Sequence, residues 1–305
     1  MPEESRAEVL ERPISSAGPS PRPTESSSTS LTERMEPKEV ETLIGRIADF
    51  YQVPESARRK GLTSEILVMP DEEFNGEVSD EIKKQLVKRG LRVELDSRPP
   101  SENRKVSSLV FEAFGTNEEQ EAKRIKDINT RNAQLIQEHV DNDGGITISV
   151  DETQSKILIR KDSGLDKKMV EMHEMIHAMA NRGPEKGTGF HSGDGSGRNV
   201  NEAVTQALTL GFLHPDISTE ELFLKVKNGE IPTPYKSYVE KLLVTLVATG
   251  KDPNPITVKD LSRYYFAQEP DVQVVLLQMN ILQKAPENVR PIIQKMFNND
   301  FARKG

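Results

Sequence analysis

The sequence predicts an α+β protein in which a small β-sheet is followed by a mainly helical part. Residues 145–150 and 156–161 are rich in β-branched side chains and flank a polar turn, which predicts a hairpin. From Leu165 onward, nearly every apolar pattern has helical spacing. Strands that come first and helices that follow are typical of α+β domains.

The composition limits the partners and the chemistry of the chain. Its net charge of −8 disfavours nucleic acid and anionic membranes as partners, since both favour a basic surface. The chain has no cysteine, so any metal must be bound by His, Asp or Glu. No apolar run approaches the ~20 residues that cross a bilayer, and no secretory signal is recognisable. We therefore expect a cytoplasmic protein by default, while export by a signal-independent route stays open.

Residues 1–35 are expected to form a disordered tail. They include PISSAGPSPRPTESSSTS, which is rich in Ser, Pro and Thr and has almost no bulky apolar residue. Such a segment cannot bury enough surface to offset its ordering entropy. One domain is expected over 36–305, with a sheet-containing part over 36–161 and a helical part over 162–305.

The N-terminal part of this domain begins with a predicted helix after Pro37, in EPKEVETLIGRIADFYQ. SEILVMP predicts a short strand that ends at Pro70. SDEIKKQLVKRGL predicts a helix with Ser79 as its N-cap, and EEQEAKRIKDINTRNAQLIQEHV, residues 118–140, predicts a long charged helix. The hairpin follows, and the helical part then continues through PYKSYVEKLLVTLVATG, TVKDLSRYYFAQ, DVQVVLLQMNILQKA and VRPIIQKMF.

The helix around VEMHEMIHAM, residues 170–179, carries two of the five histidines of the chain. We expect it to start at a capping-box-like pair, Ser163 and Asp166, and to stop near Gly183. An apolar stripe with helical spacing predicts its buried face: Leu165, Met169, Met172, Ile176 and Met179. The histidines lie about 100° from this stripe, at the edge of the buried face.

His173 and His177 are spaced four residues apart, so both imidazoles can bind one Zn²⁺. Glu174 lies beside them and can deprotonate a water at the metal, as in HExxH chemistry. The alternative is an amphipathic helix whose two histidines are merely exposed or capped by neighbouring residues. Glu171 also departs from the usual pattern, in which the residue two positions before the first histidine is uncharged.

A catalytic zinc normally has three protein ligands, and GRNVNEAVTQALTLGF offers the third. Asn199 is expected to cap this helix, with Glu202 in its first turn. Taken alone, a Glu in a first turn is explained by the helix dipole.

Together, HEMIH and NEAVT, some 25 residues later, resemble the gluzincin group of zinc metallopeptidases, especially its compact minigluzincin-like members. The strand end ILVMPDEEF, the hairpin and PYKSYVEKLL extend the resemblance over about residues 40 to 270. It implies a zincin-type helical subdomain in which zinc is held between two helices by His173, His177 and Glu202, with Glu174 as the general base.

The resemblance also indicates supporting residues. Family members often place an Asp shortly after the ligand Glu, where this chain has Thr205 and Gln206, either of which can accept a hydrogen bond from a ligand imidazole. Asn201 can orient a neighbouring loop or can be only a helix-start residue, and the second interpretation is preferred.

A hydrogen-bond donor is also needed for the tetrahedral intermediate. Tyr235 is the first candidate, because related proteins carry a Tyr ahead of the corresponding helix; Tyr238 and His191 are the others. His191 lies in GTGFHSGDGSGR, which we interpret as a flap because it lacks the Gly-Lys-Ser/Thr ending of a phosphate loop.

The expected activity is hydrolysis of peptide bonds in a peptide or protein substrate, with zinc activating water and Glu174 transferring the proton. The alternatives are a catalytically inactive gluzincin-like binding module and a metal-free helical interaction protein. The oligomeric state is left open.

Overall fold

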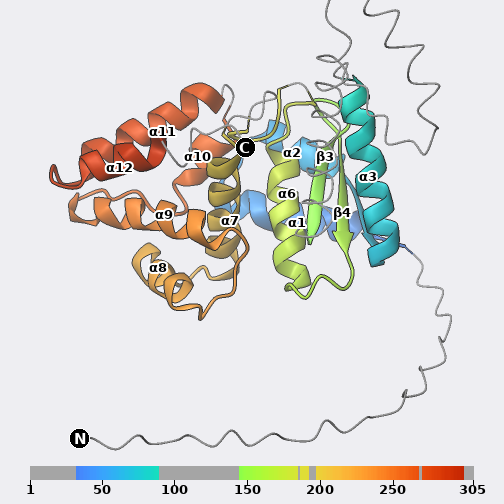
Figure 1. The fold of residues 1–305 in the computed structure, drawn as a ribbon, viewed down its shortest axis with the longest axis horizontal. Helices are drawn as coiled ribbons and strands as arrows, with labels where there is room; N and C mark the ends of the chain where they lie inside the picture. Colours follow the sequence, from blue (N-terminus) through green and yellow to red (C-terminus); the bar gives the residue numbers. More distant parts are fainter. Residues whose placement is uncertain (1–31, 89–143, 185, 192–196, 268–269, 299–305) are drawn as a thin grey trace, which may run out of the picture. The chain divides into compact units, whose positions relative to one another are not determined.

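The structure is a computed structural model that describes residues 32–88, 144–184, 186–191, 197–267 and 270–298 (Figure 1). The predicted charged helix over 118–140 and residues 1–31 of the predicted tail lie outside these ranges. The end of that tail belongs to the fold, because its Glu33–Arg34 segment is strand β1 and pairs with β2. None of the helices in the described ranges has the length and apolar character needed to cross a membrane.

The sheet has four strands in the order β1-β2-β4-β3 and is mixed. β2 and β4 pair in parallel, with Glu65 opposite Lys156, whereas β1–β2 and β3–β4 are antiparallel. The strands are β1 (Glu33–Arg34), β2 (Glu65–Met69), β3 (Gly145–Ser149) and β4 (Ser155–Arg160). The predicted hairpin is therefore confirmed, and so is the α+β class.

Along the sequence, helices lie between the strands of the sheet and after its last strand. The N-terminal part contains α1 (Pro37–Tyr51), α2 (Glu55–Leu62) and α3 (Asp71–Lys88). The C-terminal part contains α6 (Lys167–Met179), α7 (Arg198–Leu213), α8 (Thr219–Asn228), α9 (Lys236–Val247), the 3₁₀ helix η1 (Ala248–Lys251), α10 (Leu261–Tyr265), α11 (Pro270–Lys284) and α12 (Arg290–Met296).

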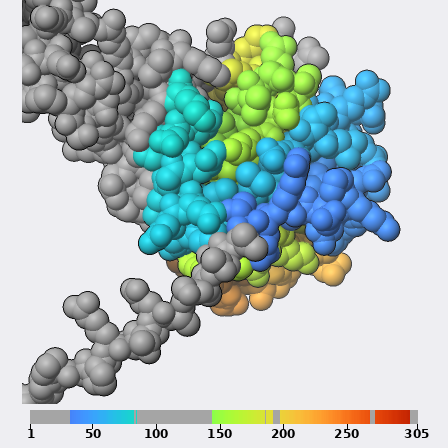
Figure 2. Space-filling model, turned by 90° about the vertical axis from the view of Figure 1, so that its right-hand side faces the viewer, coloured from blue at the N-terminus to red at the C-terminus, as the bar shows by residue number. Residues whose placement is uncertain are grey.

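The sheet separates two apolar clusters, because alternate residues of β4 point to opposite faces. Leu158 packs with Phe74 and Val78 of α3, whereas Ile157 and Ile159 join the main core that includes α6. Figure 1 shows α3 on one side of the sheet and α6 on the other. Figure 2, from the α3 side, shows the cyan atoms of α3 and the blue atoms of the first helices, with green atoms between them.

Helix α3 begins eight residues before the predicted N-cap, so the prediction for Ser79 is wrong. The helix starts at Asp71, and the Phe74 amide donates to the Pro70 carbonyl at 2.8 Å. Three acidic residues in the first turn, within DEEF, complement the positive end of the helix dipole. DEEF is therefore the first turn of a helix and not the end of a strand.

Helix α6 is buried on almost every side. Every residue over 172–180 is buried, because the helix packs against β3 and β4 as well as α2 and α7. The predicted stripe is buried apart from the partly exposed Leu165. The prediction that the histidines lie at the edge of the buried face is wrong, since His173 is 6% and His177 is 7% exposed.

The two site helices also start at residues other than those predicted. The N-cap of α6 is Asp166, whose carboxylate accepts from the Met169 amide at 3.1 Å. The N-cap of α7 is Gly197 rather than Asn199. Gly197 has φ +76°, and a Cβ there would lie 2.2 Å from the Phe190 carbonyl oxygen, so a glycine is required.

Candidate metal centre

The structure brings His173 and His177 of α6 together with Glu202 of α7. One ligand atom from each residue lies within 4.8 Å of the others. The two Nε2 atoms are 3.1 Å apart, and Glu202 Oε2 lies 3.2 Å from that of His173 and 3.3 Å from that of His177. Two imidazole nitrogens and one carboxylate oxygen form a donor set that suits a divalent metal ion such as zinc.

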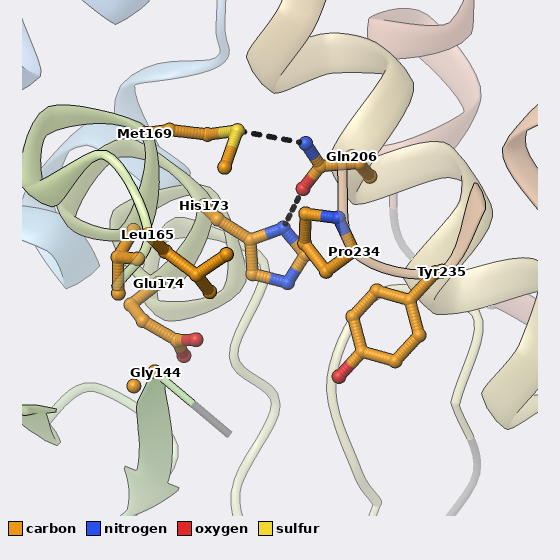
Figure 3. A pocket seen from close by; sticks show the side chains of 10 residues that line it. Gly144, Leu165, Met169, His173, Glu174, Gln206, Pro234 and Tyr235 are labelled. Atoms are coloured by element: carbon orange, nitrogen blue, oxygen red, sulfur yellow. Dashed lines mark hydrogen bonds between the residues drawn. The ribbon is translucent and has the colours of Figure 1, made fainter. Parts of the chain in front are cut away.

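Gln206 fixes the orientation of the first imidazole. Its side-chain oxygen lies 2.8 Å from Nδ1 of His173, and its Nε2 donates to Met169 Sδ at 3.4 Å (Figure 3). An amide oxygen only accepts, so Nδ1 of His173 carries the proton. In the neutral ring, Nε2 then presents its lone pair to Glu202 and His177. A positive charge, from a metal ion or a proton, is therefore favoured between these groups.

The pKa values of the site residues show the same electrostatic preference. Burial acts to raise the pKa of Glu202, but the imidazoles of His177 and His173 outweigh it and hold this pKa well below its usual range. Burial acts to lower the pKa of His173, yet its hydrogen bond to Glu202 and the nearby carboxylates raise it. The site thus keeps its carboxylate ionised and attracts a cation.

The imidazole of His177 has three polar neighbours at its Nδ1 atom. The Tyr265 hydroxyl lies 3.0 Å away, and Thr205 Oγ1 and Asn201 Nδ2 each lie 3.4 Å away. The sequence indicated Thr205 or Gln206 as a partner of the candidate ligand histidines. In the structure Thr205 lies beside His177 and Gln206 lies beside His173. Tyr265 was not anticipated: it lies in α10, 88 residues after His177, and no local pattern relates the two.

Asn201 contacts the segment that precedes α7. It is 2% exposed, and its side-chain oxygen accepts from the Phe190 amide at 3.0 Å. Because α7 begins at Arg198, Asn201 lies inside the helix and can hold the segment that precedes it. Of the two interpretations of Asn201, the structure supports the one in which it orients a neighbouring loop and not the preferred one of a helix-start residue only.

Glu174 is held against the first residues of strand β3. Thr147 Oγ1 lies 2.8 Å from Oε2 of Glu174 and 2.8 Å from its backbone oxygen. Burial raises the pKa of Glu174, against the opposing effect of the two imidazoles. A Cβ on Gly145 would lie 2.9 Å from Glu174 Cγ and 2.7 Å from Val170 Cγ1, so a glycine leaves the space that Glu174 occupies.

A cavity of about 320 Å³ adjoins the site. Its lining residues are Gly144, Gly145, Leu165, Met169, Val170, His173, Glu174, Gln206, Pro234 and Tyr235. Figure 3 shows the Tyr235 hydroxyl directed toward the side of the cavity on which the Glu174 carboxylate lies.

Tyr235 is held in an unusual backbone conformation at the start of α9. Its φ is +56°, in the left-handed region that non-glycine residues rarely adopt. Its ring stacks on that of His173, with centroids 6.0 Å apart and planes 20° apart. Of the three residues predicted as oxyanion donors, Tyr235 lines the cavity, whereas Tyr238 and His191 do not.

Comparisons with known protein families, curated proteins and solved structures gave no match to the chain. The site contains a candidate three-residue metal-binding group, and one member of it, His173, lines a cavity together with the buried carboxylate of Glu174 and the phenol of Tyr235.

Proposed function

We propose that the chain is a zinc metallopeptidase of the gluzincin type, in which His173, His177 and Glu202 hold the zinc ion. The supporting observation is the convergence of their three ligand atoms, at 3.1 to 3.3 Å from one another, beside Glu174. Bound zinc supplies Lewis acidity, which lowers the pKa of water and polarises a carbonyl. The remaining steps belong to side chains of this chain.

Glu174 is the proposed general base. It accepts a proton from the attacking water and delivers it to the leaving amine. Burial raises its pKa, which makes the carboxylate a stronger base. Thr147 keeps the carboxylate in place through the contact at 2.8 Å.

Tyr235 is the proposed donor to the oxyanion of the tetrahedral intermediate. Its ring is fixed by stacking on His173, and its hydroxyl is directed into the cavity (Figure 3). A donor that is oriented before the reaction stabilises developing negative charge at little reorganisation cost.

The surroundings of the site support a peptide substrate. β3 pairs with β4 along one edge, and none of the other described strands pairs with its second edge. An extended peptide can add to such an edge through backbone hydrogen bonds. The start of β3 lines the cavity, whose largely apolar wall can receive one side chain of the peptide.

A second candidate is a metal-binding module without catalytic activity. The groups that contact the Nδ1 atoms of His173 and His177 favour this candidate. They are Gln206 and the Tyr265 hydroxyl, which are neutral, whereas a carboxylate is common in this position. Such a module would bind zinc through the same three residues.

Metal analysis of the purified protein, together with a peptide-library cleavage assay, distinguishes these candidates. One zinc per chain, with cleavage that is lost in Glu174→Gln, supports the peptidase. Zinc without cleavage by the unaltered protein supports the binding module. Absence of zinc from protein purified and dialysed in zinc-containing buffer overturns both and favours a metal-free helical protein.

A further inference from the structure

We propose that Tyr265 is a positioning residue that sets the proton arrangement of His177 through a directed chain of hydroxyl groups. This inference rests on the proposed metal site. The chain runs from Nδ1 of His177 to the Tyr265 hydroxyl, then to Thr205 Oγ1, and ends at the backbone carbonyl of Asn201.

The final acceptor determines the direction of the whole chain. A carbonyl oxygen only accepts, so the Thr205 hydroxyl donates to Asn201 O at 2.9 Å. The Thr205 oxygen can then accept from the Tyr265 hydroxyl, 2.6 Å away. Because the Tyr265 hydroxyl donates its only proton to Thr205, its oxygen must accept a hydrogen bond from Nδ1 of His177, 3.0 Å away.

This direction fixes the tautomer of His177. Nδ1 carries the proton, so in the neutral ring Nε2 is unprotonated and presents its lone pair to the site that also contains Glu202. Asn201 Nδ2 is also near Nδ1, at 3.4 Å, but a carboxamide nitrogen donates and cannot accept this proton. Tyr265 is therefore the nearest group that can receive it.

The Tyr265 ring is held from several sides. The residue is 2% exposed, and its ring meets those of Phe190 and Phe266 edge to face. The ring centroids lie 5.5 Å and 5.4 Å from that of Tyr265, respectively. A Cβ on Gly189, which has φ +54°, would lie 2.4 Å from a ring carbon of Tyr265. Such packing leaves the hydroxyl little freedom, which is what a positioning residue requires.

A hydroxyl acceptor also suits the charge of this site. Glu174 and Glu202 already place two carboxyl groups beside the imidazoles. A third carboxylate behind His177 would add another buried negative charge, whereas Tyr265 orients the ring without adding charge. Gln206 orients His173 in the same neutral manner.

The test compares Tyr265→Phe with Tyr264→Phe in the full chain. Tyr265→Phe removes only the hydroxyl that contacts His177. Tyr264→Phe removes the same atom from the neighbouring residue, where it accepts from Asn280 at 3.0 Å and Arg263 at 3.1 Å. Zinc affinity is measured by competition with a chromogenic chelator, and the His177 tautomer in the zinc-loaded protein by ¹⁵N NMR of the imidazole nitrogens.

We expect Tyr265→Phe to weaken zinc binding by about 10- to 100-fold, the usual range for a partner of a ligand histidine. The Nδ1–H resonance of His177 should shift or broaden, while Tyr264→Phe leaves both the affinity and the resonance unchanged. Thr205→Val removes the hydroxyl group that accepts from Tyr265. This variant tests the series of hydrogen bonds at its other end, even if Tyr265→Phe does not fold. It should weaken zinc binding less, because the Tyr265 oxygen can still accept from His177.

Unchanged zinc affinity and an unchanged His177 resonance in folded Tyr265→Phe would overturn the inference while leaving the metal site intact. If Tyr265→Phe does not fold, unchanged values in Thr205→Val would do the same. Equal weakening in Tyr264→Phe would also overturn it, since the effect would then be a general one of removing a buried hydroxyl. Failure of the unaltered protein to bind zinc is a separate outcome that overturns the proposed function and this inference together.

Discussion

Replacement of Gly145 by alanine should damage the reaction more than the binding of metal. The added Cβ would lie 2.7 Å from Val170 Cγ1, 2.9 Å from Glu174 Cγ and 3.3 Å from Glu174 Oε1. Helix α6 cannot easily move away, because its residues from 172 to 179 are buried. The strand or the Glu174 side chain must therefore shift.

The expected size of this effect follows from overpacking. An extra methyl group in a well-packed core costs about 1–3 kcal/mol, which lowers the melting temperature by roughly 2–4 °C per kcal/mol in a chain of this size. A displacement of Glu174 by about 1 Å should reduce turnover about 100-fold. The zinc content should stay the same, because Glu174 is not a proposed ligand.

The assay compares Gly145→Ala with Gly76→Ala by thermal unfolding, zinc content and cleavage rate. Gly76 lies inside α3, and a Cβ there would meet nothing within 4 Å. Alanine at this helical position should stabilise the protein by about 0.5–1 kcal/mol and leave cleavage unaffected. A Gly145→Ala protein with unaltered stability and turnover would refute the packing argument.

Three further predictions concern the site. Glu174→Gln should keep its zinc while turnover falls by about 10²- to 10⁴-fold, because an amide cannot act as the base; loss of zinc, or normal turnover, would contradict this role. Glu202→Ala should lose zinc and keep its circular dichroism spectrum, whereas His191→Ala should keep zinc; the reverse result would make His191 the third ligand. Zinc affinity should fall with decreasing pH, because a metal and a proton compete for His173. Since the pKa of His173 is raised above its usual ~6.5, the fall should begin at a higher pH than for an exposed histidine pair. Chelator competition from pH 8 to pH 5 measures the zinc affinity. An affinity that stays constant down to pH 6 would count against the view that Glu202 and the nearby carboxylates raise the pKa of His173.

The parts of the fold that the sequence predicted correctly are those determined by local patterns. The β3–β4 hairpin follows from two β-branched runs around a turn. The proximity of His173 and His177 follows from their spacing of four residues on one helix. Glu202 was placed beside them by the combination of two motifs, and it lies there in the structure.

The parts that were missed depend on tertiary packing. Helix α6 is buried on almost every side because strands and helices from other parts of the chain cover it, and the residue pattern of the helix alone does not predict this. Asn201 looked like a helix-start residue because the true cap, Gly197, has no side chain to reveal it. Tyr265 lies in a short helix whose apolar pattern indicates burial but not the residue that it contacts.

The position of Tyr265 in the sequence also sets an order of events during protein synthesis. Tyr265 follows His177 by 88 residues and Thr205 by 60. At about 5–20 residues per second, roughly 3–12 s separate the synthesis of Thr205 from that of Tyr265. The three proposed metal ligands are therefore synthesised before the side chain that is proposed to orient His177. A metal ion that binds the proposed ligands in this interval does so without Tyr265, because the contact between Tyr265 and His177 can form only after α10 has been made.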